Sequence, residues 1–212
     1  MATFKTTPLF GGALVCDLPS NFADVRYEIA PPSLLPALDP TLRQVPDNQE
    51  VYIDKDGFTS IIFDITERVG GAGSGAEIDG RALTTHLEEL VGDDIDTVRV
   101  WNTTPTLFSR LNEDIPAYTL IATQSPKPGA KASERAVSPD FTAIILTLVR
   151  LEKELTDILI TINVPHIKGE YDDEDIDLEL GKQGKLIGDA VDYAAKIWQS
   201  FKVKDWALFK EI

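Results

Sequence analysis

Two stretches of the chain, residues 141–149 and 158–164, consist almost wholly of apolar and β-branched residues. Runs of this length and composition are typical of strands that are covered on both faces of a sheet. The connection between them, residues 150–155, is short, which predicts that the two strands pair as antiparallel neighbours. We therefore expect them to lie at the centre of the fold.

Shorter patterns predict the rest of a sheet. Strands are expected at residues 13–16, 97–101 and 118–123, where apolar and β-branched residues stand between turn-forming residues. Residues 51–54 and 58–65 should form a hairpin, because an Asp-Gly pair stands in the connection between them.

Two helices are predicted in addition. Leucines recur at helical spacing in residues 81–91, after a glycine-rich stretch at 70–80 that we expect to be a flexible loop. An amphipathic helix should begin near Gly184. Together the patterns predict one α/β domain over residues 1–212, an α/β/α sandwich with a mixed, mostly antiparallel central sheet and helices on both faces.

Proline marks two segments without regular structure. Residues 26–40 contain four prolines, and residues 125–138 combine two prolines with glycine and mixed charges. Proline fixes φ and lacks an N–H donor, so neither a regular helix nor a central strand suits these segments. We expect both to be exposed loops.

The charge of the chain limits its partners. Thirty-five acidic and 20 basic residues give a formal net charge of −15. Such a surface repels phosphate groups, so we expect binding to neither nucleic acid nor an anionic membrane. The charge favours a basic protein partner. The same charge is also consistent with a role in solubility alone.

The chain shows no sign of export or membrane insertion. No apolar run reaches the roughly 18 residues of a membrane-spanning helix. The first residues lack the basic start and apolar stretch of a signal peptide. The single cysteine, Cys16, cannot form an internal disulfide. We therefore expect a reducing compartment, the cytosol or the nucleus.

A polar block before the predicted hairpin has more polar side chains than a turn requires. Pro46 fixes φ, and Asp47 and Asn48 can bond their own backbone, which predicts a turn. Gln49 and Glu50 continue the polar run up to the strand that follows. The surplus side chains are candidates for contact with a partner.

Four segments carry a resemblance to a known family. They are Leu-Phe-Gly-Gly-Ala at residues 9–13, Leu-Arg-Gln-Val-Pro-Asp-Asn-Gln-Glu-Val-Tyr at 42–52, Ser-Ile-Ile-Phe-Asp-Ile-Thr-Glu at 60–67, and the apolar strand at 156–165. In this order they resemble the Ran guanine nucleotide release factor family, also called the Mog family, and we expect a fungal member of it. The resemblance implies an α/β/α fold shared with the PsbP proteins of photosystem II. It also marks the segments near 26–40 and 125–138 as loop insertions.

The resemblance implies a function and a site. The function is binding of the small GTPase Ran and release of its guanine nucleotide, in support of nucleocytoplasmic protein transport, by a monomer found in nucleus and cytoplasm. A further Ran-binding protein is a second candidate partner, and no cofactor is expected. The implied partner-binding residues are Arg43, Asp47, Asn48, Gln49, Glu50, Asp64 and Glu67.

Asp64 and Glu67 also allow other interpretations. Alternation along a strand places Asp64 on the face opposite to Phe63, and by spacing alone both carboxylates are solvated charges at a strand end. A second hypothesis is an adaptor that binds another protein without affecting nucleotide. A third is an enzyme that uses Asp64 and Glu67 as acid and base, which would require a deep pocket and a raised carboxyl pKa.

The remaining motifs indicate structure more than chemistry. Residues 71–76 match a dinucleotide-type glycine pattern, but the strand and helix that should flank it closely are missing. No P-loop sequence occurs, so we do not expect the protein to bind GTP itself. Residues 171–179 carry six carboxylates without the spacing of a calcium loop, which predicts a solvated acidic loop or a secondary docking patch.

Histidine and glycine give the last expectations. His86 should be a surface or boundary residue of its helix, and His166 has no assigned role. With one cysteine they form no recognisable zinc set. The consecutive glycines Gly11 and Gly12 predict positive φ values and an architectural role.

Overall fold

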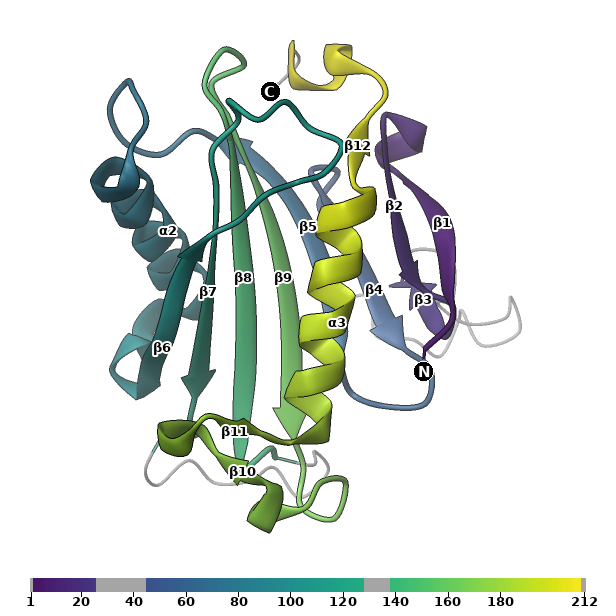
Figure 1. Cartoon of the computed structure of the whole chain (residues 1–212), viewed down its shortest axis with the longest axis vertical. Helices are drawn as coiled ribbons and strands as arrows, with labels where there is room; N and C mark the ends of the chain where they lie inside the picture. The colour runs from purple at the N-terminus through teal and green to yellow at the C-terminus, as the bar shows by residue number, and fades with distance from the viewer. Residues whose placement is uncertain (1, 26–44, 128–137, 211–212) are drawn as a thin grey trace, which may run out of the picture.

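The structure is a computed structural model that describes residues 2–25, 45–127 and 138–210. Its centre is a sheet of seven strands in the order β3-β4-β5-β9-β8-β7-β6 (Figure 1). The strands are β3 (Phe22–Asp24), β4 (Gln49–Asp54), β5 (Ser60–Glu67), β6 (Val98–Pro105), β7 (Ala117–Gln124), β8 (Phe141–Leu151) and β9 (Thr156–His166).

The predicted central pair is confirmed. β8 and β9 pair antiparallel along their whole length, from Phe141 opposite His166 to Leu151 opposite Thr156. The hairpin of β4 and β5 is confirmed as well. The sheet is not mixed, because all the strand pairs in the described part of the chain are antiparallel.

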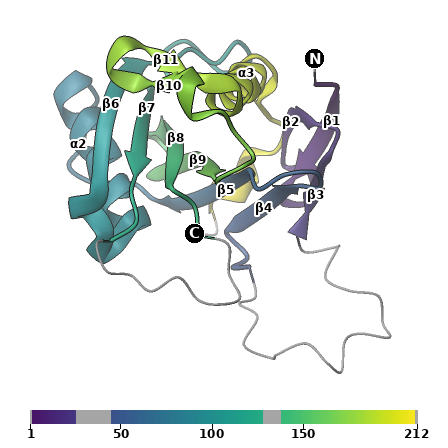
Figure 2. The same cartoon turned by 90° about the horizontal axis from the view of Figure 1, so that it is seen from below.

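Two helices cover the two faces of this sheet, as the patterns predicted (Figures 1 and 2). Helix α2 (Ala76–Val91) packs Leu83 and Leu87 against Leu146 and Leu148 of β8. Helix α3 (Gly184–Ser200) belongs to the second and larger core on the other face. That core joins apolar residues of the helix, the sheet and the N-terminal strands, including Ile187, Ala190, Ile197, Ile145, Ile162 and Leu14.

Helix α2 begins at Ala76, so the expectation of a loop up to Gly80 is wrong. Glycine is unfavourable inside a helix, yet Gly80 lies in the second turn of α2. Here the Asp79 carboxylate accepts hydrogen bonds from Ser74 Oγ at 2.6 Å and from the Gly75 backbone N–H at 2.9 Å. These bonds fix the first turn of the helix and offset the weak propensity of Gly80.

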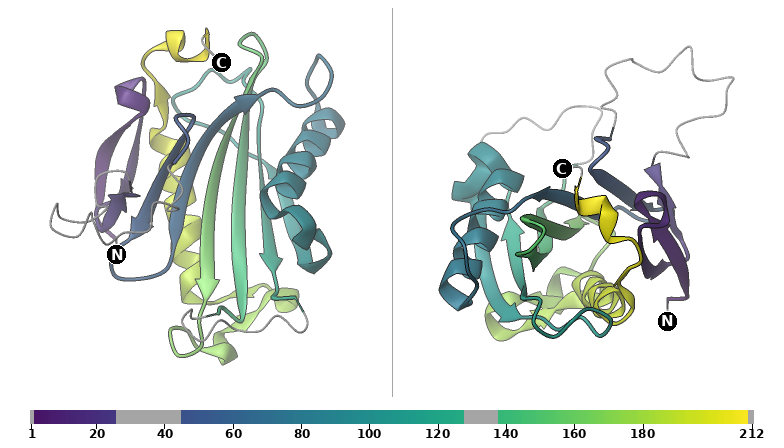
Figure 3. Two further views of the ribbon diagram at one scale, coloured as in Figure 1. Left: turned by 180° about the vertical axis from the view of Figure 1, so that it is seen from behind. Right: turned by 90° about the horizontal axis from the view of Figure 1, so that it is seen from above.

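A smaller sheet packs beside α3, at the β3–β4 edge of the main sheet (Figure 3). Its strands are β1 (Phe4–Leu9), β2 (Leu14–Pro19) and β12 (Lys202–Val203), in the order β1-β2-β12. The Asp17 backbone N–H donates to Ser200 Oγ at 2.8 Å, which ties β2 to the end of α3. A third pair, β10 (Ile176–Asp177) and β11 (Lys182–Gln183), precedes α3.

The turn between β1 and β2 has an unusual backbone. Phe10, Gly11 and Gly12 have φ values of 48°, 64° and 92°, all in the left-handed region. Glycine adopts this region without steric cost, so the positive φ values predicted for the two glycines are confirmed, and their architectural role stays a prediction. Phe10 adopts the same region although it is not a glycine, and its backbone N–H donates to Glu50 Oε1 at 2.7 Å.

The two proline-rich segments lie mostly outside the described residues. Residues 26–40 and 128–137 are not described, and the expectations for them stay predictions. Among the described residues, no helix is long and apolar enough to cross a membrane.

Candidate functional site

The polar block before β4 forms a turn that is attached to β5. The Gln49 backbone N–H donates to the Pro46 carbonyl at 2.9 Å, and the Ile65 backbone N–H donates to the Asn48 carbonyl at 3.0 Å. Asp47 and Asn48 are exposed at the tip of this turn. The turn therefore presents its side chains at the end of the sheet where β4 begins and β5 ends.

Asp64 lies within reach of this turn. Gln49 stands directly opposite Asp64 in the strand pair and donates through Nε2 to Oδ2 at 2.9 Å. Asn48 donates through Nδ2 to Oδ1 at 2.9 Å. Partial burial raises the pKa of the Asp64 carboxyl, while the bond from Gln49 and the neighbouring His86 oppose this shift. The two amides hold the carboxylate without neutralising its charge.

Glu67 is exposed at the C-terminal end of β5 and lies on the opposite face from Asp64. Residues three apart on a strand point to opposite faces of the sheet. Asp64 faces the α2 side, where His86 lies, whereas Glu67 lines a cleft of about 570 Å³ with Arg68, Leu155 and Phe209. An acid and base that act on one substrate must both reach it, so this arrangement argues against the enzyme hypothesis.

Glu50 points inward, and its predicted role in direct partner contact has to be corrected. Its side chain is 1% exposed, because period-two alternation on β4 places it on the core face beside Tyr52. Oε1 accepts the bond from the Phe10 N–H, and Oε2 accepts from the Tyr52 hydroxyl at 3.1 Å. Glu50 thus joins the Leu-Phe-Gly-Gly-Ala segment to the polar turn from inside the protein.

The carboxylates of the site form no ion pairs with described cations, although Arg68 and Lys210 line the same cleft as Glu67. No described lysine or arginine side chain forms an ion pair with Asp47, Asp64 or Glu67. Arg43, the basic residue among the predicted site residues, lies outside the described residues. The described part of the site is therefore a set of carboxylates without ion-pair partners at one end of the sheet.

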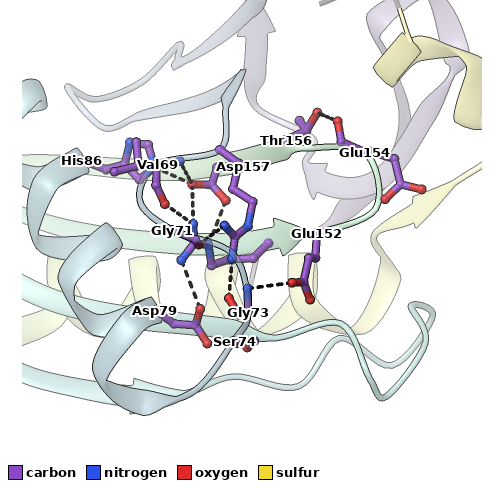
Figure 4. Close-up of polar contacts among 12 residues, drawn as sticks. Val69, Gly71, Gly73, Ser74, Asp79, His86, Glu152, Glu154, Thr156 and Asp157 are labelled. Atoms are coloured by element: carbon purple, nitrogen blue, oxygen red, sulfur yellow. Dashed lines mark hydrogen bonds and ion pairs between the residues drawn. The ribbon is translucent and has the colours of Figure 1, made fainter.

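A buried charged cluster lies behind this surface (Figure 4). Arg150 at the end of β8 stands opposite Asp157 at the start of β9. Its Nε donates to Asp157 Oδ1 at 3.0 Å, and its Nη1 donates to Asp79 Oδ1 at 3.1 Å. Its Nη2 donates to the Val69 carbonyl. Arg150 is 1% exposed, and both aspartates are fully buried.

His86 belongs to this cluster, so the expectation that it is a surface or boundary residue is wrong. It is 2% exposed, and its Nε2 lies 2.9 Å from Asp157 Oδ2. A carboxylate can only accept, so Nε2 carries the hydrogen. Burial alone would raise the pKa of Asp157, but the hydrogen bonds from His86, the Val69 N–H and Arg150 hold it below its ordinary value. The cluster joins α2, β8, β9 and the loop that follows Glu67.

One signal in the sequence could have revealed part of this cluster. Arg150 and Asp157 stand near the connected ends of two strands that are otherwise mostly apolar. A charged residue in such a position is seldom buried without a partner of opposite charge. In an antiparallel pair with a short connection, residues at equal distances from the turn stand opposite each other, and Arg150 and Asp157 form the pair next to Leu151 and Thr156. Asp79 and His86 carry no comparable signal.

The glycine-rich loop between β5 and α2 has a structural explanation. Arg68 donates to the carbonyls of Gly71 and Gly73, and the Gly73 N–H donates to Glu152 Oε1 at 2.7 Å. These contacts engage the loop within the protein, and the antiparallel sheet lacks the parallel unit of a dinucleotide fold. Among the described residues, no three His, Cys, Asp or Glu side chains gather as metal ligands.

The acidic segment at 171–179 lies beyond the other end of β9, away from Glu67 (Figure 1). It contains a strand and short helical turns, and so has more local structure than the solvated loop that was predicted. Asp177 accepts from the Leu180 N–H at 3.0 Å, and Glu179 pairs with Arg99 at 3.0 Å. The segment is thus separate from the candidate site.

The fold and the site define a class of protein. It is an α/β sandwich with an antiparallel sheet, and one end of that sheet carries the carboxylates of Asp47, Asp64 and Glu67. The chain belongs to the family of Ran-interacting Mog1 proteins, whose family model matches residues 7–165.

Individual relatives agree with this membership. A protein of Dictyostelium discoideum called probable Ran guanine nucleotide release factor is 29% identical over 167 residues, which cover 76% of this chain and 73% of that protein. The nuclear import protein mog1 of Schizosaccharomyces pombe is 25% identical over 164 residues, which cover 74% of this chain and 75% of that protein.

A solved structure shows the same fold. The crystal structure of the Ran-binding protein Mog1p of Saccharomyces cerevisiae aligns with a TM-score of 0.64 at 24% identity, and the alignment covers 99% of this chain and 100% of that one. The α/β fold that the resemblance implied is confirmed by this likeness and by the strand order.

Proposed function

We propose that this protein binds the small GTPase Ran and promotes release of its guanine nucleotide, and that it thereby supports nucleocytoplasmic protein transport. Membership of a family described as Ran-interacting supports the choice of partner. The observation that supports the proposal for the site is the set of carboxylates, Asp47, Asp64 and Glu67, that form no ion pair with a described lysine or arginine.

Release of a bound nucleotide requires a difference in affinity. A GTPase holds its nucleotide through basic groups and Mg²⁺ that contact the phosphates. A partner accelerates release when it binds the nucleotide-free state more tightly than the loaded state. Carboxylates on the partner can attract the basic groups that the phosphates otherwise occupy. Asp47, Asp64 and Glu67 have the charge for this role.

The other predicted site residues support these carboxylates. Asn48 and Gln49 hold the Asp64 carboxylate through their amides, and both remain within reach of a docked partner. Glu50 keeps the polar turn in place from inside the protein. Arg43 precedes the same turn in the sequence and stays in the proposed site.

The test reverses the charge of Glu67, because a substitution at this residue should disturb the fold least among the three carboxylates. It is exposed, and in the described structure its side chain makes no hydrogen bond whose loss would disturb the fold. Asp64→Lys, in contrast, would also break the bonds from Asn48 and Gln49. Loss of a desolvated interfacial charge weakens binding by about 2–5 kcal/mol, or roughly 30-fold to several thousand-fold.

The experiment measures the affinity of Glu67→Lys for Ran that is nucleotide-free, GDP-loaded or GTP-loaded. We expect Glu67→Lys to lose most binding and Glu67→Gln to lose less. Glu174→Lys makes the same charge change at the far end of β9 and serves as the matched control. A Glu67→Lys protein that is folded by circular dichroism and binds all three forms like wild type would contradict the site. Binding without accelerated release would favour the adaptor hypothesis.

A further inference from the structure

The turn between β8 and β9 exposes an apolar side chain in an unfavourable backbone conformation. Leu155 is 71% exposed, and its φ is +52°. Glycine or asparagine usually occupies such a left-handed position in a hairpin, because a side chain at Cβ crowds the backbone there. Phe10 is the one other non-glycine residue with positive φ in the described part of the chain. Its conformation coincides with an internal bond to Glu50.

The backbone around Leu155 is held firmly. The Arg68 N–H donates to the Leu155 carbonyl at 2.8 Å, and the Leu155 N–H lies 3.3 Å from the Glu152 carbonyl. At the base of the turn, Arg150 and Asp157 form the buried ion pair described above. Leu155 is therefore presented in a fixed position, and a partner that binds it need not order the turn first.

Leu155 adjoins the proposed site. Glu67 pairs with Thr156, the residue that follows Leu155, and Leu155 and Glu67 line the same cleft of about 570 Å³. Phe209, 4% exposed, lies in the wall of this cleft, and Glu154 also borders it. An exposed apolar group thus lines the same cleft as two carboxylates, Glu67 and Glu154, and two basic residues, Arg68 and Lys210.

We propose that Leu155 is the apolar anchor of the partner-binding surface, and that it inserts into an apolar socket of the partner bordered by basic side chains that meet Glu67 and Glu154. The proposal rests on the proposed function, with Ran as the occupant. The positive φ of Leu155 disfavours the folded state, and its exposed side chain belongs to neither apolar core, so no side-chain packing offsets this cost. An apolar anchor beside charged groups is a common arrangement at protein interfaces.

An exposed leucine alone would not carry this proposal, since single apolar residues are normal on protein surfaces. Leu180 shows the difference. It is 76% exposed, but its φ is not positive, and it lies in the acidic segment at the other end of the molecule. It provides a matched control for the same substitution.

The experiment compares Leu155→Asn with Leu180→Asn. Asparagine tolerates positive φ, so Leu155→Asn should raise the thermal midpoint by about 2–4 °C. It should also weaken Ran binding by about 30-fold, the effect of losing a dominant interface residue. Leu155→Met keeps an apolar side chain and should bind nearly as wild type does. Leu180→Asn should leave binding unchanged. A merely structural residue would not move stability and affinity in opposite directions.

The outcomes separate this inference from the function on which it rests. If Leu155→Asn binds Ran as wild type does while Glu67→Lys does not, the apolar anchor is wrong and the proposed function stands. If Leu155→Asn and Leu180→Asn weaken binding equally, the anchor is also wrong. If the wild-type protein binds no form of Ran, the proposed function fails and the anchor fails with it.

Discussion

Replacing Arg150 with methionine should strongly destabilise the protein. The substitution keeps an apolar stem of similar length but removes the guanidinium that contacts Asp157, Asp79 and the Val69 carbonyl. Both aspartates would remain fully buried. Each would keep other hydrogen bonds, from Val69 and His86 for Asp157 and from Ser74 and Gly75 for Asp79. Neither aspartate would keep its ion pair with residue 150.

The magnitude follows from this geometry. Removing one partner of a buried ion pair costs about 3–5 kcal/mol, because the other charge stays buried without compensation. A domain of this kind is stable by only about 5–15 kcal/mol, so the loss is a large share of the total. At about 2–4 °C for each kcal/mol in a chain of this length, the thermal midpoint should fall by roughly 6–20 °C.

Urea unfolding followed by circular dichroism measures the change. Arg81→Met removes an exposed arginine that pairs with Glu77 on the surface of α2, and it should cost less than about 1 kcal/mol. Adding Asp157→Asn to Arg150→Met should recover part of the loss, since it removes one of the two orphaned charges. An Arg150→Met protein within about 1 kcal/mol of wild type would refute the view that this cluster anchors the end of the sheet.

Two further predictions concern buried groups that titrate. Burial lowers the pKa of His166 below its ordinary value of 6.5, so the unfolded chain binds a proton that the folded protein excludes. The stability that neutral His166 contributes is therefore fully present above pH 6.5, and it is lost as the pH falls toward the lowered pKa of the folded protein. The urea midpoint of wild type should therefore drop more between pH 7.5 and 5.5 than that of His166→Gln, and equal drops would count against this assignment. Burial, with smaller effects of Asp17 and Glu50, strongly raises the pKa of the Cys16 thiol. A thiol reagent at pH 8 should therefore label it only after unfolding, and rapid labelling of the folded protein would show that the site is open.

The parts of the fold that local patterns determine were predictable from the sequence. The apolar strands at 141–149 and 158–164 pair as expected, because continuous burial on both faces leaves a clear composition. Helix α3 begins at Gly184 as its periodicity predicted. The hairpin of β4 and β5 agrees with its Asp-Gly turn. Each of these depends on neighbours in the sequence.

The errors arise where a distant partner decides the position of a side chain. His86 stands between the leucines of an amphipathic helix, and its burial depends on Asp157, which is 71 residues away. Glu50 turns inward toward the Phe10 N–H, 40 residues away. In both cases a polar residue is predicted to lie at the surface unless its buried hydrogen-bond partner is known. The opposite facing of Asp64 and Glu67, in contrast, follows from strand geometry and was available from the sequence.

Nucleotide release is the most direct test of the proposed function. Ran loaded with a fluorescent methylanthraniloyl nucleotide is mixed with increasing concentrations of the protein, and the loss of fluorescence is followed in the presence of excess unlabelled nucleotide. The account predicts that wild type accelerates release in a concentration-dependent manner, and that folded Glu67→Lys leaves it near the spontaneous rate. Release by wild type at the spontaneous rate at every concentration, or equal acceleration by Glu67→Lys, would contradict it.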